Sequence, residues 1–565
     1  MSTISPSLRP SGTVMDIERL GRLFPYRLSF MRILVRRLMQ EKWRIQRVRF
    51  DLDDEGYGVS IYEIQAPENL FSFVVFSSFL DPSRRSDRVI AEEWDMTVTL
   101  CEGRVDEHRL ERFRQNVPLQ ENGRLDSGCL VLSRANKSAR TFEHVVSALA
   151  EGKQPSVATM AKVGYLYRTT AVYGSGKFGM ADWEKVRTKY RDFGRPFSAE
   201  MFSCYMIRQY SLDQAEFLAR KRSPDKAVPM QDTLKRYIGI GNATGLGMAP
   251  YLINHPMLIS RWIEIRETAL AKALQHGEFS PQALIRFASL VKKAMRHLSE
   301  IATENKDQNA INEATRVEAG EFLQWLEAGL ETLQSWQDVV AHYNDSCSVE
   351  TQELLNTLLI EIYPEHVNDL EEDMCVAECY EHSPEMSATE LRDLIQTNYD
   401  WALEVDFTAE QTRAVFWYRS EEKMEPRIGS RGIDTGADRE LNVGIAWSVR
   451  RCYDALAEML DRDDEISVGE FLFECPQHRQ VVRRLQTLAK FHYGDIRTNF
   501  LDVDVMPIHL LRCKLSFFGV SKFDPRSRFW VRNTMFQGAP LVSDIGQEFL
   551  DDWCFPVIPD EKFDA

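Results

Sequence analysis

The sequence lacks any apolar run long enough to cross a bilayer. Its longest strongly apolar stretch, residues 71–80, is interrupted by serines and has about half the length that a membrane-spanning helix needs. The first residues, MSTISPSLRPSG, lack the basic, then apolar, then small-residue order of a secretory signal. We therefore expect no membrane span and a cytoplasmic location.

The chain also lacks an excess of positive charge. It has 69 Lys and Arg residues against 85 Asp and Glu residues, and a formal net charge of −16. An acidic protein of this kind does not neutralise many phosphates with a general basic surface, which argues against bulk nucleic-acid binding. Its ten cysteines are scattered over 565 residues, a pattern typical of free thiols in a reducing compartment.

Several catalytic motifs are absent. There is no G-x-S-x-G elbow and no H-E-x-x-H motif, and none of the 11 histidines follows a Glu by three positions. The pairs Cys379-x-x-His382 and Cys475-x-x-His478 form only a weak zinc pattern, because the chain has no Cys-x-x-Cys. We predict no metal site, and the sequence indicates no particular cofactor.

The patterns of apolar residues that the sequence does contain predict a mixed fold of strands and helices. Short β-rich runs at 44–52, 57–64, 70–80 and 87–100 predict a small antiparallel sheet, and Asp54-Glu55-Gly56 suits a hairpin turn. Helical periodicity dominates beyond about residue 180, as in the apolar stripe of 281–301. The predicted class is α+β, with a small N-terminal antiparallel β-rich unit followed by a large, mainly α-helical body.

The length of the chain implies several folding units. We predict a lead-in and basic amphipathic helix at 1–40, a β-rich α+β domain at 41–155, a mainly helical domain at 156–490, and a mixed C-terminal segment at 491–565 that packs on the body. Ten basic residues face one acid between Arg19 and Arg49. Such arginines are solvated or paired with distant acids in most helices, and recognition of RNA, an acidic partner or a membrane surface is the alternative.

A glycine cluster at 238–250 is the first candidate site. Gly239, Gly241, Gly245 and Gly247 have a spacing that superficially resembles loops whose backbone amides hold a phosphate or cofactor at a helix start. A polar segment precedes them instead of a buried strand. A tight helix-to-helix connection is therefore the structural alternative.

A second glycine cluster lies at 173–180 and contains Lys177. It is not a Walker loop, because Phe178 stands where that loop needs Ser or Thr. We interpret it either as a basic loop that closes over an anion through Lys177 or as a connection between the sheet and the helices.

Two arginine-rich segments are candidates for binding an anion. Segment 416–432 combines aromatic residues, glycines and a proline with Arg419 and Arg427, which we predict to bind a carboxylate or phosphate by bidentate contacts. Glutamates in the same segment also allow a purely structural, salt-bridged loop. Segment 522–533 has a related composition, with Arg526 and Arg528 as further candidates.

A loop histidine completes the predicted site. His255 stands before a proline and close to the first glycine cluster, so it is the preferred proton donor or acceptor. The functional hypothesis is an intracellular enzyme that acts on a small anionic substrate, bearing a carboxylate or phosphate, in a cleft between domains lined by Arg and Gly. The reaction class and oligomeric state are left open. The alternative is a non-catalytic helical interaction protein that binds a partner through its basic N-terminal helix.

Overall fold

The structure is a computed structural model that describes residues 7–81, 83, 93–120, 124–169, 186, 188–245, 256–276, 279–301, 303–330, 332–374, 382–407, 416–419, 426–429, 445–495, 506–527 and 530–559. The chain divides into two compact units. Unit 1 comprises Met1–Phe24, Gly245–Phe279 and Gln334–Lys514, and unit 2 comprises Pro25–Thr244, Ser280–Leu333 and Leu515–Ala565.

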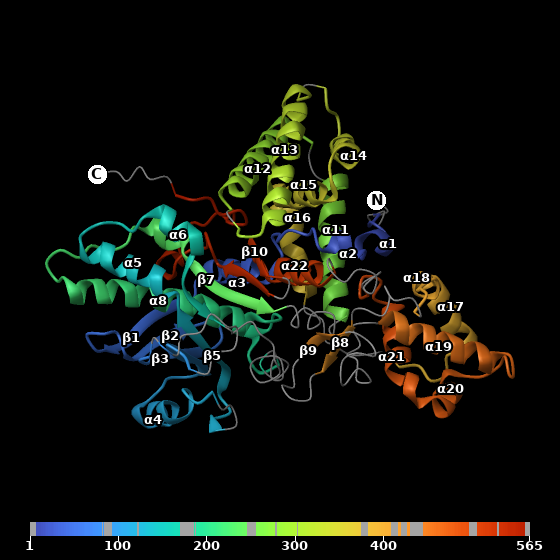
Figure 1. Cartoon of the computed structure of the whole chain (residues 1–565), viewed down its shortest axis with the longest axis horizontal. Helices are drawn as coiled ribbons and strands as arrows, with labels where there is room; N and C mark the ends of the chain where they lie inside the picture. Colours follow the sequence, from blue (N-terminus) through green and yellow to red (C-terminus); the bar gives the residue numbers. More distant parts are fainter. Residues whose placement is uncertain are drawn as a thin grey trace. The chain divides into compact units, whose positions relative to one another are not determined.

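Unit 2 is built on a nine-stranded sheet in the order β1-β2-β3-β4-β5-β6-β7-β11-β10 (Figure 1). The strands are β1 (Arg44–Leu52), β2 (Gly58–Gln65), β3 (Leu70–Ser77), β4 (Met96–Glu102), β5 (Cys129–Lys137), β6 (Tyr165–Thr169), β7 (Gly239–Gly245), β10 (Lys522–Ser527) and β11 (Trp530–Met535). Strands β1 to β6 pair antiparallel, and β7 joins β6 in parallel. The predicted N-terminal antiparallel unit is confirmed.

The turn between β1 and β2 lies where the sequence predicted a hairpin. The Asp53 carboxylate accepts hydrogen bonds from the backbone N–H groups of Glu55 and Tyr57, at 3.0 and 2.8 Å. Gly56 has a φ of +83°, which a residue without Cβ adopts at no steric cost. In the strand that follows, consecutive residues of both faces are buried, and β3 is buried almost throughout.

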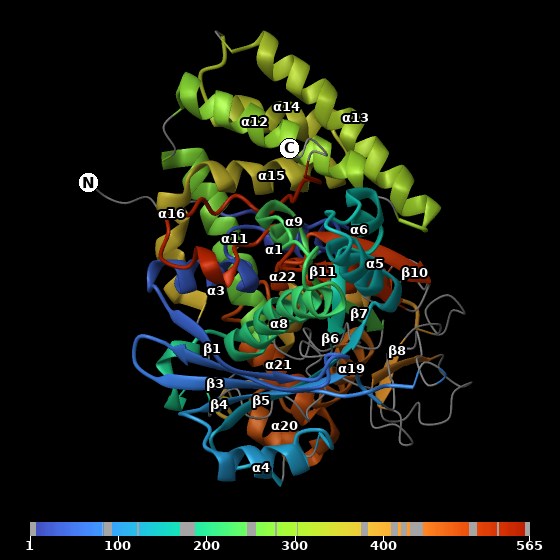
Figure 2. The same cartoon turned by 90° about the vertical axis from the view of Figure 1, so that its left-hand side faces the viewer.

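Helices cover both faces of this sheet (Figure 2). On one face lies α8 (Ser198–Arg222), whose Asp213 and Gln214 accept hydrogen bonds from Tyr62 on β2 and Tyr167 on β6. On the other face, Leu110 and Phe113 of α4 (Glu107–Asn116) pack on alternate residues of β2 and β3. Other helices of unit 2 are α3 (Phe30–Gln40), α5 (Ala139–Ala150), α6 (Val157–Val163), α9 (Asp232–Tyr237), α12 (Pro281–Glu300) and α13 (Lys306–Ala328).

The C-terminal part of unit 2 contains a pair of strands followed by an irregular segment. The candidate segment 522–533 contributes to strands β10 and β11, which pair antiparallel. No helix follows η9 (Val542–Asp544), because Gly546 has a φ of +90° and the described residues after it are irregular. We call residues 544–559 the C-terminal strap. Its Asp551 carboxylate bonds to Arg32 and Arg36 of α3 at 3.0 and 2.8 Å.

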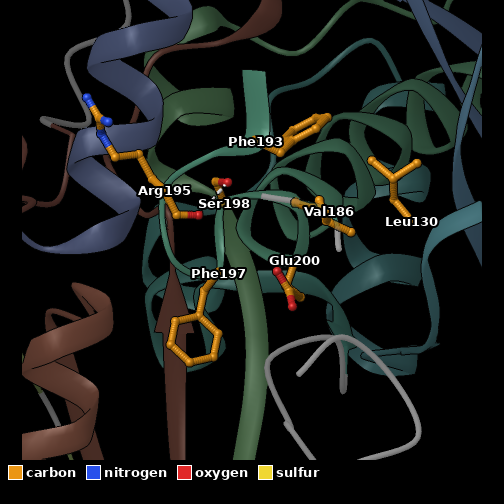
Figure 3. A pocket seen from close by; sticks show the side chains of 8 residues that line it. Leu130, Val186, Phe193, Arg195, Phe197, Ser198 and Glu200 are labelled. Atoms are coloured by element: carbon orange, nitrogen blue, oxygen red, sulfur yellow. Dashed lines mark hydrogen bonds between the residues drawn. The ribbon is translucent and has the colours of Figure 1, made fainter. Parts of the chain in front are cut away.

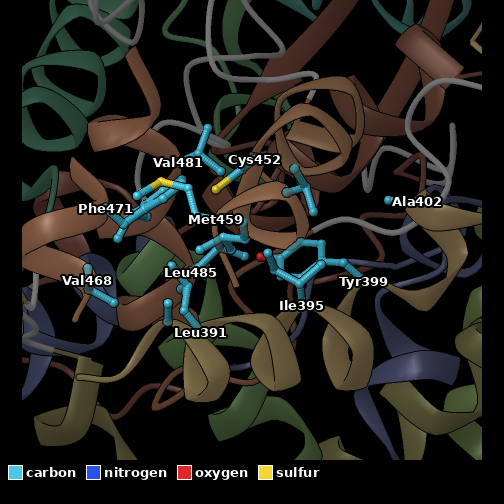
Figure 4. Packing of buried hydrophobic residues seen from close by; sticks show 14 of the residues in the cluster. Leu391, Ile395, Tyr399, Ala402, Cys452, Met459, Val468, Phe471, Val481 and Leu485 are labelled. Atoms are coloured by element: carbon cyan, nitrogen blue, oxygen red, sulfur yellow. The ribbon is translucent and has the colours of Figure 1, made fainter. Parts of the chain in front are cut away.

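Unit 1 is mainly helical, as predicted for the body of the chain. Its helices are α1 (Ser11–Val14), α2 (Ile17–Leu20), α11 (Pro256–His276), α14 (Trp336–Ser346), α15 (Val349–Ile362), α16 (Pro364–Asn368), α17 (Ala388–Asn398), α18 (Asp400–Leu403), α19 (Ile445–Leu460), α20 (Val468–Glu474) and α21 (Arg479–Leu488). Leu391, Ile395, Cys452, Phe471 and Leu485 form the centre of one core between α17, α19, α20 and α21 (Figure 4).

The segment expected as an arginine-rich loop in unit 1 contains a hairpin of β8 (Phe416–Arg419) and β9 (Pro426–Gly429). Across the described residues of both units, no helix is long and apolar enough to span a membrane.

Candidate functional site

A small recess lies at the start of α8 in unit 2 (Figure 3). It is lined by Leu130, Val186, Phe193, Arg195, Phe197, Ser198, Ala199 and Glu200. The space that the centre of a water molecule can reach is about 10 Å³, which is room for about one water. Most of the lining is apolar or aromatic, so the carboxyl group of Glu200 stands out chemically.

The backbone at Phe197 determines where α8 begins. Phe197 has a φ of 56°, in the left-handed region, although it is not a glycine. This conformation costs a non-glycine residue about 1–2 kcal/mol, so the surrounding packing must stabilise it. The Phe197 ring packs on Phe30 and Phe518, with centroid distances of 5.6 and 5.0 Å. The sharp turn places Glu200 in the first turn of α8.

Glu200 is a buried carboxyl group in a nearly apolar setting. It is only 5% exposed, and burial raises its pKa to about 7. Its own backbone N–H favours the charged form, but desolvation outweighs that effect. No side chain in the described part of the chain donates a hydrogen bond to this carboxyl group or forms an ion pair with it. A carboxyl group of this kind exchanges a proton near neutral pH.

Two neighbours of Glu200 clarify what the recess can do. The guanidinium of Arg195 points away from Glu200 (Figure 3), so Arg195 lines the recess without directing its charge toward the carboxyl group. Cys204 follows one helical turn after Glu200 and is fully buried, and burial raises the pKa of its thiol well above the usual value. Cys204 is therefore a packed thiol. The recess suits proton transfer rather than binding of an anion.

The glycine cluster contributes a strand. Gly239, Gly241 and Gly245 lie in β7, so the helix-to-helix connection considered for this segment is wrong. A Cβ atom on Gly239 would lie 2.3 Å from the carbonyl oxygen of Met535, and one on Gly241 would lie 2.5 Å from the Tyr165 ring. The glycines therefore allow neighbouring groups to approach the strand closely. Their role in binding a phosphate or cofactor stays a prediction.

The two predicted arginines of unit 1 lie on the two strands of one hairpin. Arg427 is opposite Tyr418, and Arg419 is opposite Pro426, so the two arginines are not register partners. In unit 2, Arg526 already contacts the carboxylates of Glu304 and Asp524, at 2.5 and 3.5 Å. That these arginines share one cleft is still a prediction.

Other predicted site residues lie outside the described residues. They are Lys177, Gly247, His255 and Arg528. In the part of the chain that the structure describes, no group of three or more His, Cys, Asp or Glu side chains could hold a metal ion.

Glu200 was not predicted from the sequence, although a signal was present. It is a single acid in the run Phe197 to Tyr205, which is otherwise apolar or weakly polar. Such an acid is buried if the run becomes a core helix, and α8 is one. Comparisons with protein-family models, curated proteins and solved structures found no match to this chain. The geometry of the site is therefore the basis for assigning a function.

Proposed function

We propose that this chain is an enzyme that acts on a small molecule by proton transfer at Glu200. The observation that carries the proposal is a carboxyl group that is 5% exposed, has a pKa of about 7 and faces a recess. Structural carboxylates in proteins are normally paired or hydrogen-bonded. Keeping one unpaired and buried costs stability, and such groups are concentrated at functional sites.

The pKa determines the chemistry that Glu200 could perform. At neutral pH about half of the molecules would hold the proton, so the same group could serve as acid or base. An ordinary glutamate, with a pKa near 4.3, would be a much weaker base. The recess has room for about one water. Glu200 would therefore take a proton either from that water or from a substrate group at the mouth of the recess.

The proposed substrate is a small compound that bears a carboxylate or phosphate, and the proposed location is the cytoplasm. The arginine-rich composition of segments 416–432 and 522–533 supports the first part, because guanidinium groups bind oxyanions by bidentate contacts. Cys101 and Cys129 support the second part, because they are register partners on β4 and β5 and are both free thiols.

The test compares the wild-type protein with Glu200→Gln, which keeps the shape of the side chain but cannot exchange a proton at this pH. Each purified protein is incubated with a mixture of small carboxylates and phosphates, and substrate loss is followed by mass spectrometry. We expect turnover by the wild type and a loss of at least about 100-fold in the variant. Glu313→Gln, at an exposed position on α13, is the control that should keep activity. Equal turnover by wild type and Glu200→Gln would reject the proposal.

The anion-binding part has a separate test. Arg427→Ala should raise KM for the substrate while leaving thermal stability nearly unchanged, and Arg427→Lys should restore part of the affinity. A large loss of thermal stability in Arg427→Ala, with KM unchanged, would instead identify a structural salt-bridged hairpin. The partner-binding alternative through the N-terminal helix gains no support from α3, because Arg32 and Arg36 are buried against Asp551.

A further inference from the structure

We propose that Cys101 on β4 and Cys129 on β5 form a redox-responsive pair, which closes into a disulfide when the protein meets an oxidant. Both residues belong to unit 2, and both are free thiols in the structure. They lie opposite each other in the register of the two strands. The pair is a modification site whose chemistry does not require proton transfer by Glu200.

The backbone hydrogen bonds show what kind of strand pair the two cysteines form. The N–H of Glu102 points to β5, where it donates to the carbonyl oxygen of Gly128 at 2.8 Å. Neighbouring residues of a strand direct their backbone groups to opposite sides, so Cys101 and Cys129 are a non-hydrogen-bonded pair, with Cα atoms about 4.5 Å apart. Disulfides join residues whose Cα atoms are about 4.4–6.8 Å apart. The bond therefore requires no large movement of the backbone.

Both thiols lie on the face of the sheet that α4 covers. Cys101 belongs to the apolar cluster that includes Leu110 and Phe113 of α4, and Cys129 packs against the same cluster. Cys101 is 0% exposed, whereas Cys129 is only partly buried. A small oxidant can therefore reach Cys129 first, and Cys101 is placed to react with the oxidised sulfur second.

The surroundings of Cys129 make its oxidation slow. Its Sγ donates to Oδ1 of Asp126 at 3.5 Å, and Arg109 holds that carboxylate by two contacts, at 2.9 and 3.0 Å. Burial, assisted by the charge of Asp126, raises the pKa of the Cys129 thiol to about 12. The thiolate is the reactive form, so only a small fraction of Cys129 is reactive at neutral pH. The pair therefore stays reduced in a reducing compartment and responds to sustained exposure to an oxidant.

The oxidant is a peroxide, and hydrogen peroxide is the simplest member of that class. The Cys129 sulfur attacks one peroxide oxygen, the O–O bond breaks, and the released hydroxide takes the thiol proton to form water, which leaves a sulfenic acid on Cys129. The Cys101 sulfur then attacks the Cys129 sulfur. The S–O bond breaks as the S–S bond forms, and the hydroxyl group leaves as water with the proton of Cys101. The two thiols lose two electrons in total, and the peroxide gains them.

The disulfide would restrain two features of unit 2. It closes the segment 102–128, which contains α4. It also joins β4 and β5 where their register shifts, next to Leu130, which lines the recess that contains Glu200. Closing a loop removes conformational freedom from the unfolded chain and limits local opening. The oxidised protein should therefore unfold at a higher temperature than the reduced protein.

The experiment treats the full chain with hydrogen peroxide at mildly alkaline pH, which increases the thiolate fraction. The protein is then digested without reduction and analysed by mass spectrometry. We expect a peptide pair linked through Cys101 and Cys129, a higher thermal midpoint and slower hydrogen exchange in 102–128, all reversed by dithiothreitol. Cys101→Ser and Cys129→Ser should each lack all three changes. Cys347→Ser, at another partly buried cysteine, is the matched control and should form the link as the wild type does.

Three results would overturn the proposal. The first is a wild-type protein in which Cys129 stays reduced throughout the exposure. The second is oxidation of Cys129 to its sulfinic acid without a link, or a link to a cysteine other than Cys101, because either result would mean that Cys101 does not capture the oxidised sulfur. The third is a link between Cys101 and Cys129 that lowers the thermal midpoint, which would mean that the bond strains the two strands.

Discussion

Arg266 and Glu353 form an ion pair of 2.6 Å between Nη2 and Oε2, with neither side chain exposed. Arg9 and Arg19 donate to the other oxygen of the same carboxylate, at 2.8 and 2.7 Å. Burial alone would raise the pKa of Glu353, but attraction to Arg9 and Arg266 outweighs it and holds the pKa far below its usual range. This network fastens the N-terminal segment to α11 and α15 within unit 1.

Removing the charge of Glu353 should destabilise unit 1. In Glu353→Gln, three guanidiniums would lose their shared carboxylate, and breaking a buried pair in this way costs about 3–5 kcal/mol. Urea denaturation would measure the loss. Glu313→Gln removes an exposed partner of Arg316 and should leave the unfolding free energy unchanged within error. A similar, negligible effect for both variants would show that the buried network contributes no net stability.

The lowered pKa of Glu353 predicts how the free energy of unfolding changes in acid. The folded pKa of Glu353 lies below the unfolded value, so its contribution is complete above that unfolded pKa of about 4.3 and is lost as the pH falls further. The difference in unfolding free energy between wild type and Glu353→Gln should therefore be constant near neutral pH and should shrink below about pH 4. A difference that stays constant into strong acid would contradict the lowered pKa.

The raised pKa of Glu200 predicts that stability depends on pH in the opposite direction. Its pKa is raised from 4.5 to about 7, so the folded state holds the proton more tightly and stability falls as the pH rises between these values. Glu200→Gln, which is always neutral, should be more stable than the wild type by at most about 3 kcal/mol near pH 8 and equally stable near pH 4. Denaturation at the two pH values measures this. Equal stability at both would mean that Glu200 is not desolvated.

The lowered pKa of His297, which contacts the C-terminal strap, predicts a third effect of pH on stability. Its Nδ1 lies 2.6 Å from the carbonyl oxygen of Pro556, and burial lowers its pKa to about 4. The folded state therefore disfavours the imidazolium, and stability should decrease by about 3 kcal/mol as the pH falls from about 6.5 to about 4. His297→Gln should lack this decrease. Denaturation curves at the two pH values, wild type against variant, would reveal the difference, and parallel slopes would contradict it.

The parts of the fold that the sequence predicted were those with local signals. Strands β1 to β3 have clear β-rich runs, and the Asp53–Tyr57 turn has its own hydrogen-bonding residues. The glycine strand β7 has no such signal, because glycine disfavours strands and only contacts with distant residues hold it there. The conformation of the strap has no local signal either, because Asp551 bonds to arginines more than 500 positions away.

The site was harder to predict than the fold, for a physical reason. The pKa of Glu200 depends on desolvation by residues from separate segments, including Leu130 and Phe193, and composition does not reveal which acids become buried. The arginines were visible as a cluster in the sequence, and the structure places Arg419 and Arg427 on the two strands of one hairpin. Their function, and that of His255 and Lys177, stays a prediction.

The glycines of β7 give a final prediction that separates close packing from flexibility. In Gly239→Ala, the new methyl group would lie 2.3 Å from the backbone oxygen of Met535, so the sheet would have to shift at a cost of about 1–3 kcal/mol. In Gly320→Ala, within α13, the nearest atom is the flexible end of Met295 at 3.2 Å. That variant should gain up to about 1 kcal/mol, because alanine favours a helix. Opposite shifts of the thermal midpoint would confirm that Gly239 is required for packing. If Gly239→Ala leaves the thermal midpoint unchanged, close packing does not require glycine at that position. Ligand binding would then be the remaining reason for it.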